Sequence, residues 1–454
     1  MKSDDLRRAI GEIDDDLIEN ADKKPGSNAR RNLKKWGMIA AALLLVVAAI
    51  FPLGIRLFKQ NTVETFTAGD LMEGIVPRVR SDAPTAVSND DATAATDFAV
   101  RLFQASYDGK NTLLSPLSVF VALSMAANGA EGETRAQMES VLGMTVSELN
   151  EFFTVYLTSL TQRSRVKLKL ANSIWLRDCE GFSVKEAFLQ TNADVYGAGA
   201  YRAPFDHSTV RDVNRWVEEN TEGMIKEIVD RFDAEDVLLL VNALYFSGKW
   251  QMPYKGKDVV PGVFHLENGT DVDATFLFGT EHRYIADGDR AVGFCKSYED
   301  DRYAFAALLP NEGISVGEYL ATLDGETLST LLQNAQHLPV NSAIPEFKTA
   351  YETVLNDALS GLGMPDAFDP AADFSGITES LDPLYIGDVR HKTAIDLNEK
   401  GTSAAAATSI RGKGASAPVD DVPPVVLDRP FVYLIYDTAT CLPLFIGVLN
   451  DPTK

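Results

Sequence analysis

The segment Glu399–Ser416, which reads E-K-G-T-S-A-A-A-A-T-S-I-R-G-K-G-A-S, constrains the fold of this chain more than any other stretch. It continues from His391–Glu399, which has the period-two pattern of a half-buried strand. One set of alternate positions is His391, Thr393, Ile395 and Leu397, and the other is Lys392, Ala394, Asp396 and Asn398. After Gly401 a weaker alternation persists, and both charges, Arg411 and Lys413, fall in the same set of alternate positions. Extended as a strand, the segment would bury its uncharged set and leave both charges in water. The uncharged set is Thr402, Ala404, Ala406, Thr408, Ile410, Gly412 and Gly414.

Alanine and glycine are poor strand formers, so this segment has little to hold it in a sheet by itself. We therefore predict a stretch that is a loop in one state of the protein and a strand in another. Two other interpretations fit the composition. The run Ala404–Ala407 favours the start of a helix, and Gly401–Ser416 as a whole is typical of a flexible linker of small residues.

Motifs along most of the chain resemble those of the serpin family, and they occur in that family's order. The match runs from about Asn89 to the C-terminus, and the ordered set is far more specific than any single motif. The motifs are Ser115-Pro116-Leu117-Ser118, Gly129-Ala130-Glu131-Gly132-Glu133-Thr134, Asn214-Arg215-Trp216-Val217 with Thr221 and Gly223, Leu240–Phe246 with Gly248-Lys249-Trp250, His391-Lys392 through Thr402 and Ala404–Thr408, Asp428-Arg429-Pro430-Phe431 and Leu444-Phe445-Ile446-Gly447.

The predicted fold class is α+β, because helical and strand patterns mix without a regular βαβ repeat. The resemblance implies the serpin fold, with three β-sheets, surrounding helices and an exposed reactive-centre loop. Two helix boundaries can be located from the sequence. Ser115 suits an N-cap and Pro116 a first helical position, while Gly143 suits the end of the next helix. Strands are expected at 166–170, 237–246, 303–309, 393–398, 431–436 and 444–449.

The resemblance assigns roles to two groups of residues. The hinge at which the loop enters the main sheet is Glu399, Gly401, Thr402, Ser403, Ala404, Ala405, Ala406, Ala407 and Thr408. The switch at which two strands of that sheet part is Ser115, Ser118, Asn242 and His391, with Trp250 at the end of the sheet where insertion starts. Taken singly, each switch residue also fits a helix cap, a satisfied polar group in the core or ordinary aromatic packing.

The implied activity is suicide inhibition of a serine protease rather than catalysis. The protease attacks the loop, which then slides into the main sheet and carries the acylated enzyme with it. Counting the family's usual fourteen residues from Gly401 places the reactive bond between Ala415 and Ser416, which suits elastase-like enzymes. Cleavage after Lys413 or Arg411 by trypsin-like enzymes is the alternative, and a non-inhibitory serpin cleaved only as a substrate is a further one.

One position departs from the family pattern. Glu346 stands where many relatives carry a base that pairs with the residue matching Glu399. Two acids at these positions form no such bridge, which weakens the expected hold on the loop at its insertion point.

The composition narrows the choice of partners. A net charge of −23 argues against nucleic acid. The three cysteines are too widely spaced for a metal motif or disulfide framework and are predicted to be buried thiols, and the five histidines have no metal-ligand spacing. We expect no metal and no cofactor. The motifs G-x-S-x-G, Walker A and H-E-x-x-H do not occur, which disfavours a hydrolase.

The N-terminal region is predicted to have three parts before the serpin domain at 94–454. Residues 1–35 are a charged tail, either solvated or a short amphipathic partner-binding helix, and 56–93 are a spacer. Residues 36–55 are uncharged and mostly apolar, long enough to cross a bilayer. Because the positive excess precedes this run, the tail is expected in the cytoplasm and the serpin domain outside the cell. Secretion after cleavage of a signal peptide is the alternative.

Overall fold

A computed structural model describes residues 66–78, 86–160, 165–223, 225–233, 236–379, 383–402 and 424–454, without the side chains of residues 242 and 243. The chain divides into two units, Met1–Phe66 and Thr67–Lys454, and all described helices and strands belong to the second unit.

The described α-helices are α4 (Asn89–Ser106), α5 (Pro116–Ala127), α6 (Gly132–Leu142), α7 (Val146–Leu160), α8 (Glu186–Thr191), α9 (His207–Asn220), α10 (Val316–Leu320), α11 (Gly325–Gln333) and α12 (Asn356–Leu362). A π-helix, η1 (Asn192–Tyr196), and two 3-10 helices, η2 (Gly256–Asp258) and η3 (Pro365–Phe368), accompany them.

The described strands are β1 (Gly69–Asp70), β2 (Thr112–Leu114), β3 (Lys167–Arg177), β4 (Gly199–Ala203), β5 (Leu238–Lys249), β6 (Val259–His265), β7 (Asp271–Glu281), β8 (Arg283–Asp287), β9 (Ala291–Ser297), β10 (Tyr303–Pro310), β11 (Val340–Pro345), β12 (Phe347–Val354), β13 (Arg390–Asn398), β14 (Gly401–Thr402), β15 (Val425–Val426), β16 (Phe431–Asp437) and β17 (Pro443–Leu449).

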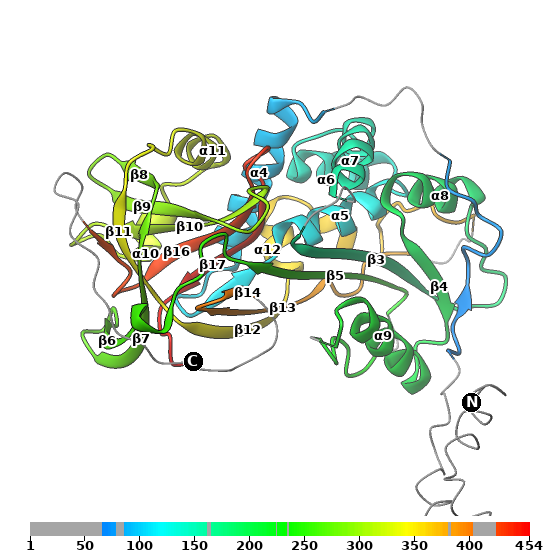
Figure 1. Cartoon of the computed structure of the whole chain (residues 1–454). Helices are drawn as coiled ribbons and strands as arrows, with labels where there is room; N and C mark the ends of the chain where they lie inside the picture. The colour runs from blue at the N-terminus through cyan, green and yellow to red at the C-terminus, as the bar shows by residue number, and fades with distance from the viewer. Residues whose placement is uncertain are drawn as a thin grey trace, which may run out of the picture. The chain divides into compact units, whose positions relative to one another are not determined.

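These strands form three sheets. Sheet A has the order β1-β4-β3-β5-β14-β13-β12, sheet B the order β2-β17-β16-β10-β9-β8, and sheet C the order β15-β11-β7-β6. Most neighbouring strands are antiparallel, while β3 with β4 and β11 with β15 are parallel. Three sheets surrounded by helices, of which A and C are mixed and B is antiparallel, confirm the predicted α+β class and the three-sheet architecture (Figure 1).

The predicted helix boundaries are confirmed. Pro116 is the first residue of α5 and Ser115 its N-cap, although the Ser115 side chain makes no capping hydrogen bond. Helix α6 ends before Gly143, which adopts the left-handed conformation with φ of 77°. Each expected strand overlaps an observed one, but β3 runs past its predicted end because the polar residues Asn172 and Ser173 hide the strand pattern.

The three cysteines are free. Cys295 and Cys441 are buried as predicted, and burial raises the pKa of both thiols. Cys179 is only partly buried, so the prediction of a buried thiol is wrong there.

Strand β5 is covered on both faces, as its nearly continuous apolar sequence predicts. Leu240 and Phe246 face the large core that includes α5. Leu239 and Val241 face a smaller cluster with Val217 of α9. Figure 1 shows α9 on the opposite side of sheet A from α5. Even and odd residues of β5 therefore mark the two faces of the sheet.

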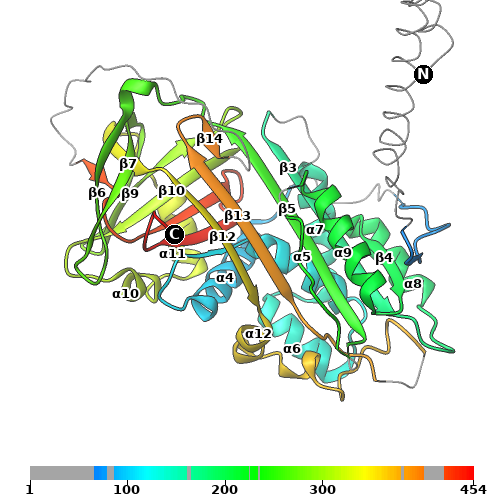
Figure 2. The same cartoon turned by 90° about the horizontal axis from the view of Figure 1, so that it is seen from below.

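The two central long strands of sheet A, β5 and β13, run side by side with β14 between them at one end (Figure 2). Because β14 is antiparallel to both, β5 and β13 run in the same direction. Strand β13 alternates buried and partly exposed residues along its whole length, which confirms the predicted half-buried strand.

The part of the predicted spacer from Thr67 onward belongs to the second unit and packs within it. Strand β1 pairs with β4 at the edge of sheet A. Thr67 donates from its backbone N and from Oγ1 to Asp212 Oδ2 of α9, at 2.8 and 2.6 Å. Helix α4 begins at Asn89, before the predicted domain start at Ala94. The packed structure thus reaches further toward the N-terminus than predicted, because main-chain pairing and polar contacts leave no apolar periodicity in the sequence.

Within the described residues, no helix combines the length and the apolar character needed to cross a bilayer. The predicted tail, residues 1–35, and the predicted anchor, residues 36–55, lie outside the described residues.

Candidate functional site: the end of sheet A where the loop begins

Strand β14 consists of Gly401 and Thr402, the start of the predicted insertable segment. Thr402 lies opposite Leu397 of β13 and Gly248 of β5. A Cβ at Gly401 would collide with the backbone oxygen of Gly248, so the approach of the two strands requires glycine. The Thr402 side chain is 2% exposed, and its Oγ1 hydrogen-bonds the hydroxyl of Tyr298 at 2.6 Å. These two residues already belong to the sheet, with Thr402 facing the core.

The turn Asn398–Lys400, which joins β13 to β14, is held by three donors. Trp250 Nε1 donates to Asn398 O at 3.0 Å. The backbone N–H groups of Trp250 and Tyr254 donate to the carbonyls of the other two turn residues, at 2.9 and 3.0 Å. The Trp250 ring is fully buried and stacks on Tyr298 with centroids 4.6 Å apart. The tryptophan that the resemblance associates with insertion therefore contacts the turn that precedes the insertable segment.

Beside Trp250 lies a buried ion pair that the sequence analysis missed. Lys296 Nζ is 2.8 Å from Glu281 Oε1, and the two side chains are 5% and 9% exposed. The same Nζ lies 4.2 Å from the centroid of the Tyr254 ring, in a cation–π contact. Each charge depends on the other, since a buried charge without its partner is strongly destabilising. The available signal was a lysine in the otherwise uncharged run Ala291–Ser297.

The acid pair at the same end of the sheet is present. Glu346 directly precedes β12, and its backbone N donates to Thr275 O at 2.7 Å. Burial and then the neighbouring charge of Glu399 raise the pKa of Glu346. A protonated Glu346 can share a hydrogen bond with Glu399, whereas two carboxylates repel each other. Glu399, the first predicted hinge residue, thus has an acid neighbour at position 346, while its basic partner is the adjacent Lys400, with Nζ 3.5 Å from Oε1.

Two of the predicted switch residues meet in the core. The backbone N of Ser115 donates to Nε2 of His391 at 3.0 Å, and both residues are buried. Burial lowers the pKa of His391 to about 4, so the imidazole is neutral at physiological pH and can accept this bond. Thr393 Oγ1 donates to Leu113 O at 2.7 Å. These bonds fasten β13 to the chain that leads into α5.

The other predicted switch residues lie in the expected elements. Ser118 is buried in the first turn of α5, and its backbone N donates to Ser115 O. Asn242 lies in β5, where its backbone pairs with Asn172 of β3, and its side chain is outside the description. Among the described atoms, Ser115 Oγ is buried without a hydrogen-bond partner. The switch role of this group stays a prediction.

Most of the predicted loop lies outside the described residues. This concerns the hinge residues Ser403, Ala404, Ala405, Ala406, Ala407 and Thr408, the alternative reactive residues Arg411 and Lys413, and the predicted reactive bond Ala415–Ser416.

Comparison with known proteins identifies the family. A family model described as serpin (serine protease inhibitor) matches residues 93–452. An uncharacterised serpin-like protein of Thermococcus kodakarensis is 32% identical over 354 residues, 76% of this chain and 82% of that protein. Alpha-1-antiproteinase S of Cavia porcellus is 30% identical, over 78% of this chain and 88% of that protein. The chain belongs to the serpin family, whose members are generally inhibitors of serine proteases and not catalytic enzymes.

Two solved structures of one thermophilic serpin, tengpin, are similar to this chain. Its native state is 39% identical with a TM-score of 0.79, and the match covers 85% of this chain and 99% of that one. Its latent state is 38% identical with a TM-score of 0.71, over 80% and 98% of the two chains. The described fold is thus more similar to the native state than to the latent state.

Proposed function

We propose that this chain is a suicide inhibitor of an elastase-like serine protease. The protease forms an acyl-enzyme at Ala415, and the cleaved loop then inserts between β5 and β13. The acylated enzyme is dragged along sheet A before water can release it.

The observation that carries this proposal is the position of β14. Two residues of the loop are paired on both sides at the end of sheet A, so insertion can continue from an existing start instead of nucleating a new strand. The Gly401 contact and the buried Thr402 set which side chains face the core.

The register of β14 gives a consistent path for the rest of the loop. Continued by six residues, it brings Thr408 opposite Asn242 of β5 and opposite His391 of β13. Thr408 has the parity of Thr402 and would face the core on the side of Ser115. The predicted switch thus lies at the level where a small polar side chain would arrive. Each uncharged alternate residue would face inward in the same way.

The similarity to tengpin agrees with a loop that is still outside the sheet. The TM-score is higher for the native state than for the latent state of that serpin. The same difference is expected if sheet A of this chain has yet to receive its additional strand.

The proposal is tested by mixing the full-length chain with an elastase-type protease. We expect an adduct that survives SDS and a released C-terminal fragment whose sequence begins at Ser416. Complete cleavage of the loop with free, active protease would indicate a non-inhibitory, substrate-type serpin. A fragment that begins at Gly414 or Gly412 would assign cleavage to Lys413 or Arg411 and hence specificity for trypsin-like enzymes.

We further propose that residues 36–55 anchor the protein in the cell membrane with the serpin domain outside. The twenty uncharged, mostly apolar residues and the basic residues before them support this. Release of the protein from membranes by detergent but not by high salt is the expected result. Recovery of a shortened chain in the medium would support secretion after cleavage instead.

A further inference from the structure

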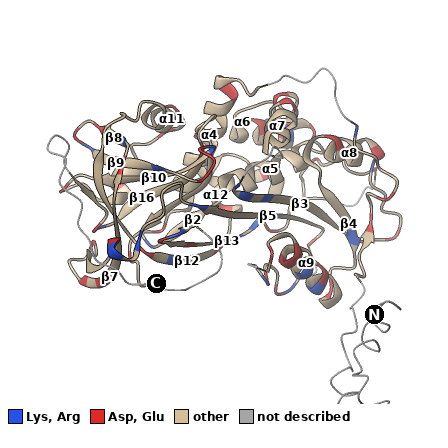
Figure 3. Cartoon of the chain, viewed as in Figure 1, with Lys and Arg blue, Asp and Glu red and all other residues tan. Residues whose placement is uncertain are grey.

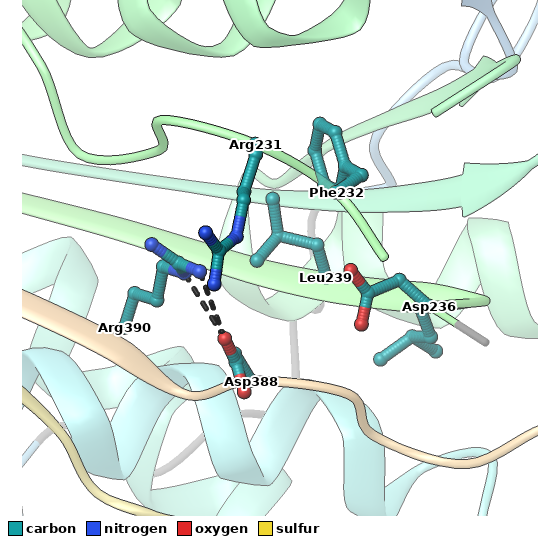
Figure 4. Close-up of a pocket in the computed structure, with 7 residues that line it drawn as sticks. Arg231, Phe232, Asp236, Leu239, Asp388 and Arg390 are labelled. Carbon is teal, nitrogen blue, oxygen red and sulfur yellow. Dashed lines mark hydrogen bonds and ion pairs between the residues drawn. The ribbon is translucent and has the colours of Figure 1, made fainter. Parts of the chain in front are cut away.

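A charged pocket lies at the other end of sheet A from β14. It is a small hollow that is open to solvent, and it lies beside β5 and the segment that leads into β13 (Figure 4). Its lining residues are Arg231, Phe232, Asp236, Leu238, Leu239, Asp388 and Arg390. Figure 3 shows residues of both charges on the nearby helix α9. The resemblance to serpins gave no role to any residue of this pocket.

Two acids, Asp236 and Asp388, and two bases, Arg231 and Arg390, line the pocket. Arg390 pairs with Asp388 and with Asp230, each at 3.0 Å. Asp236 accepts a hydrogen bond from the backbone N of Asp233 at 2.7 Å but forms no ion pair with any described residue. Burial and the charges of Asp388 and Asp233 raise the pKa of Asp236. The charge of Arg177 acts in the opposite direction. A cation placed between Asp236 and Asp388 would relieve the repulsion between these two carboxylates.

If the loop extended β14 in the same register, one of its residues would lie at the level of this pocket. Continued by nine residues from Thr402, it brings Arg411 opposite Leu239 of β5 and opposite Asp388. Nine residues of strand span roughly 30 Å, the distance that the loop must travel to reach this level. Parity agrees with this path, because Arg411 would share a face with Leu239, which belongs to the cluster with Val217 of α9.

Just beyond the pocket, a main-chain hydrogen bond joins the two segments that flank the path of an inserting strand. The backbone N of Gly387 donates to Leu238 O at 3.1 Å and so joins the two flanking segments directly. The next loop residue, Gly412, would arrive opposite both ends of this bond. Arg411 is thus the last residue to pair before the bond must break.

We propose that the pocket is the docking site for the Arg411 side chain of the cleaved and inserted loop. The aliphatic part of the side chain lies over Leu239 and Phe232, and the guanidinium binds between Asp236 and Asp388. Each predicted cleavage position, after Arg411, Lys413 or Ala415, leaves Arg411 on the inserted strand. The inference rests on the proposed function, since it requires insertion.

The test compares intact and nicked full-length protein by thermal melting. A metalloprotease, which forms no acyl-enzyme that the chain could trap, nicks the loop on the C-terminal side of Arg411, as fragment sequencing verifies. It is applied to the wild type and to the variants Arg411→Ala, Asp236→Asn and the double variant. We expect each single change to leave the intact protein within about 1 °C of wild type and to lower the melting temperature of the nicked protein by about 1–3 °C. The melting temperature of the nicked double variant should be no lower than that of either single variant, because each substitution removes the same contact.

Lys413→Ala is the matched control, since it removes the same charge two residues further along the same face. It should lower the melting temperature of the nicked protein by less than Arg411→Ala does. Equal changes in melting temperature for Lys413→Ala and Arg411→Ala would overturn the docking site. Additive changes in the double variant would do the same. If nicking fails to raise the melting temperature of the wild type, insertion itself is refuted, and the proposed function fails instead.

Discussion

Sheets A and B differ in how their central strands pair. In sheet B, β16 and β17 pair from Phe431 opposite Leu449 to Tyr436 opposite Pro443, and every residue of both strands is buried. In sheet A, the long strands β5 and β13 are bridged by the two residues of β14 at one end. At the other end, the bond from Gly387 to Leu238 joins the flanking segments.

The difference bears on the proposed insertion. In sheet B, β16 is paired along its length with both β10 and β17, so a further strand could not enter beside it without separating these pairs. Sheet A has a short strand, β14, between β5 and β13 at one end. If the proposed insertion is right, cleavage lengthens this strand and stabilises sheet A, while sheet B stays unchanged.

The largest expected effect comes from cutting the loop. Nicking should raise the melting temperature by more than about 10 °C, because insertion adds strand pairing and apolar burial that the intact protein lacks. Tryptophan fluorescence during heating measures it, and equal melting temperatures for both forms would remove the contrast between the sheets.

A charge at the start of the inserted strand should block completion of sheet A. Thr402→Arg would place a guanidinium where Thr402 is 2% exposed and bonded to Tyr298. We expect the yield of SDS-stable adduct to fall at least about tenfold while the loop is still cleaved, because burying an unpaired charge costs several kcal/mol. Thr402→Ser keeps the hydroxyl and should retain most of the adduct. Undiminished adduct from the arginine variant would contradict insertion at this position.

A cavity in sheet B should affect both states equally. Leu434 is fully buried in β16, opposite Ile446. Leu434→Ala is expected to lower the free energy of unfolding by about 2–5 kcal/mol in the intact and in the nicked protein alike. Guanidinium titration of both forms measures this. A loss confined to one form would show that sheet B also changes on cleavage.

Acid should weaken the attachment of β13 through His391. Its pKa is about 4 in the folded protein and about 6.5 when unfolded, so the unfolded chain binds more protons between these values. The stabilisation is complete above about pH 6.5 and is lost as the pH falls to 4, by on the order of 3 kcal/mol. His391→Gln should flatten this part of the curve of stability against pH. An unchanged slope in the variant would assign the acid sensitivity elsewhere.

The smallest expected effect concerns the acid pair beside the turn. Glu346→Lys would replace repulsion from Glu399 by attraction and stabilise the intact protein at pH 7 by less than about 1 kcal/mol. Because the pKa of Glu346 is raised, its proton-linked stabilisation is present at low pH and is lost as the pH rises through that pKa. Glu346→Gln should abolish this dependence and give an intermediate stability. A destabilised lysine variant would contradict the pairing.

Much of the fold could be predicted because local patterns determine it. The helix boundaries at Pro116 and Gly143 follow from backbone preferences of single residues, and the structure confirms them. The alternation from His391 to Leu397 correctly separated the buried face of β13 from the other face. The ordered motifs also identified the family that the comparisons show.

The site was only partly predictable. Trp250 and His391 were named from the resemblance, but their partners, the turn at Asn398 and the backbone of Ser115, were known only once the chain was folded. The ion pair of Lys296 and Glu281 was not predicted, because the two residues lie on strands of different sheets.

The sequence by itself determined which side chains of the loop segment can share a face, since that depends only on the period of an extended chain. The tertiary structure decided that Gly401 and Thr402 lie within sheet A, and in which register. It also decided that Asp236 and Asp388 line one pocket at the level of Arg411 in that register. Register between strands about 150 residues apart is set by packing and close approach, and no local pattern encodes it.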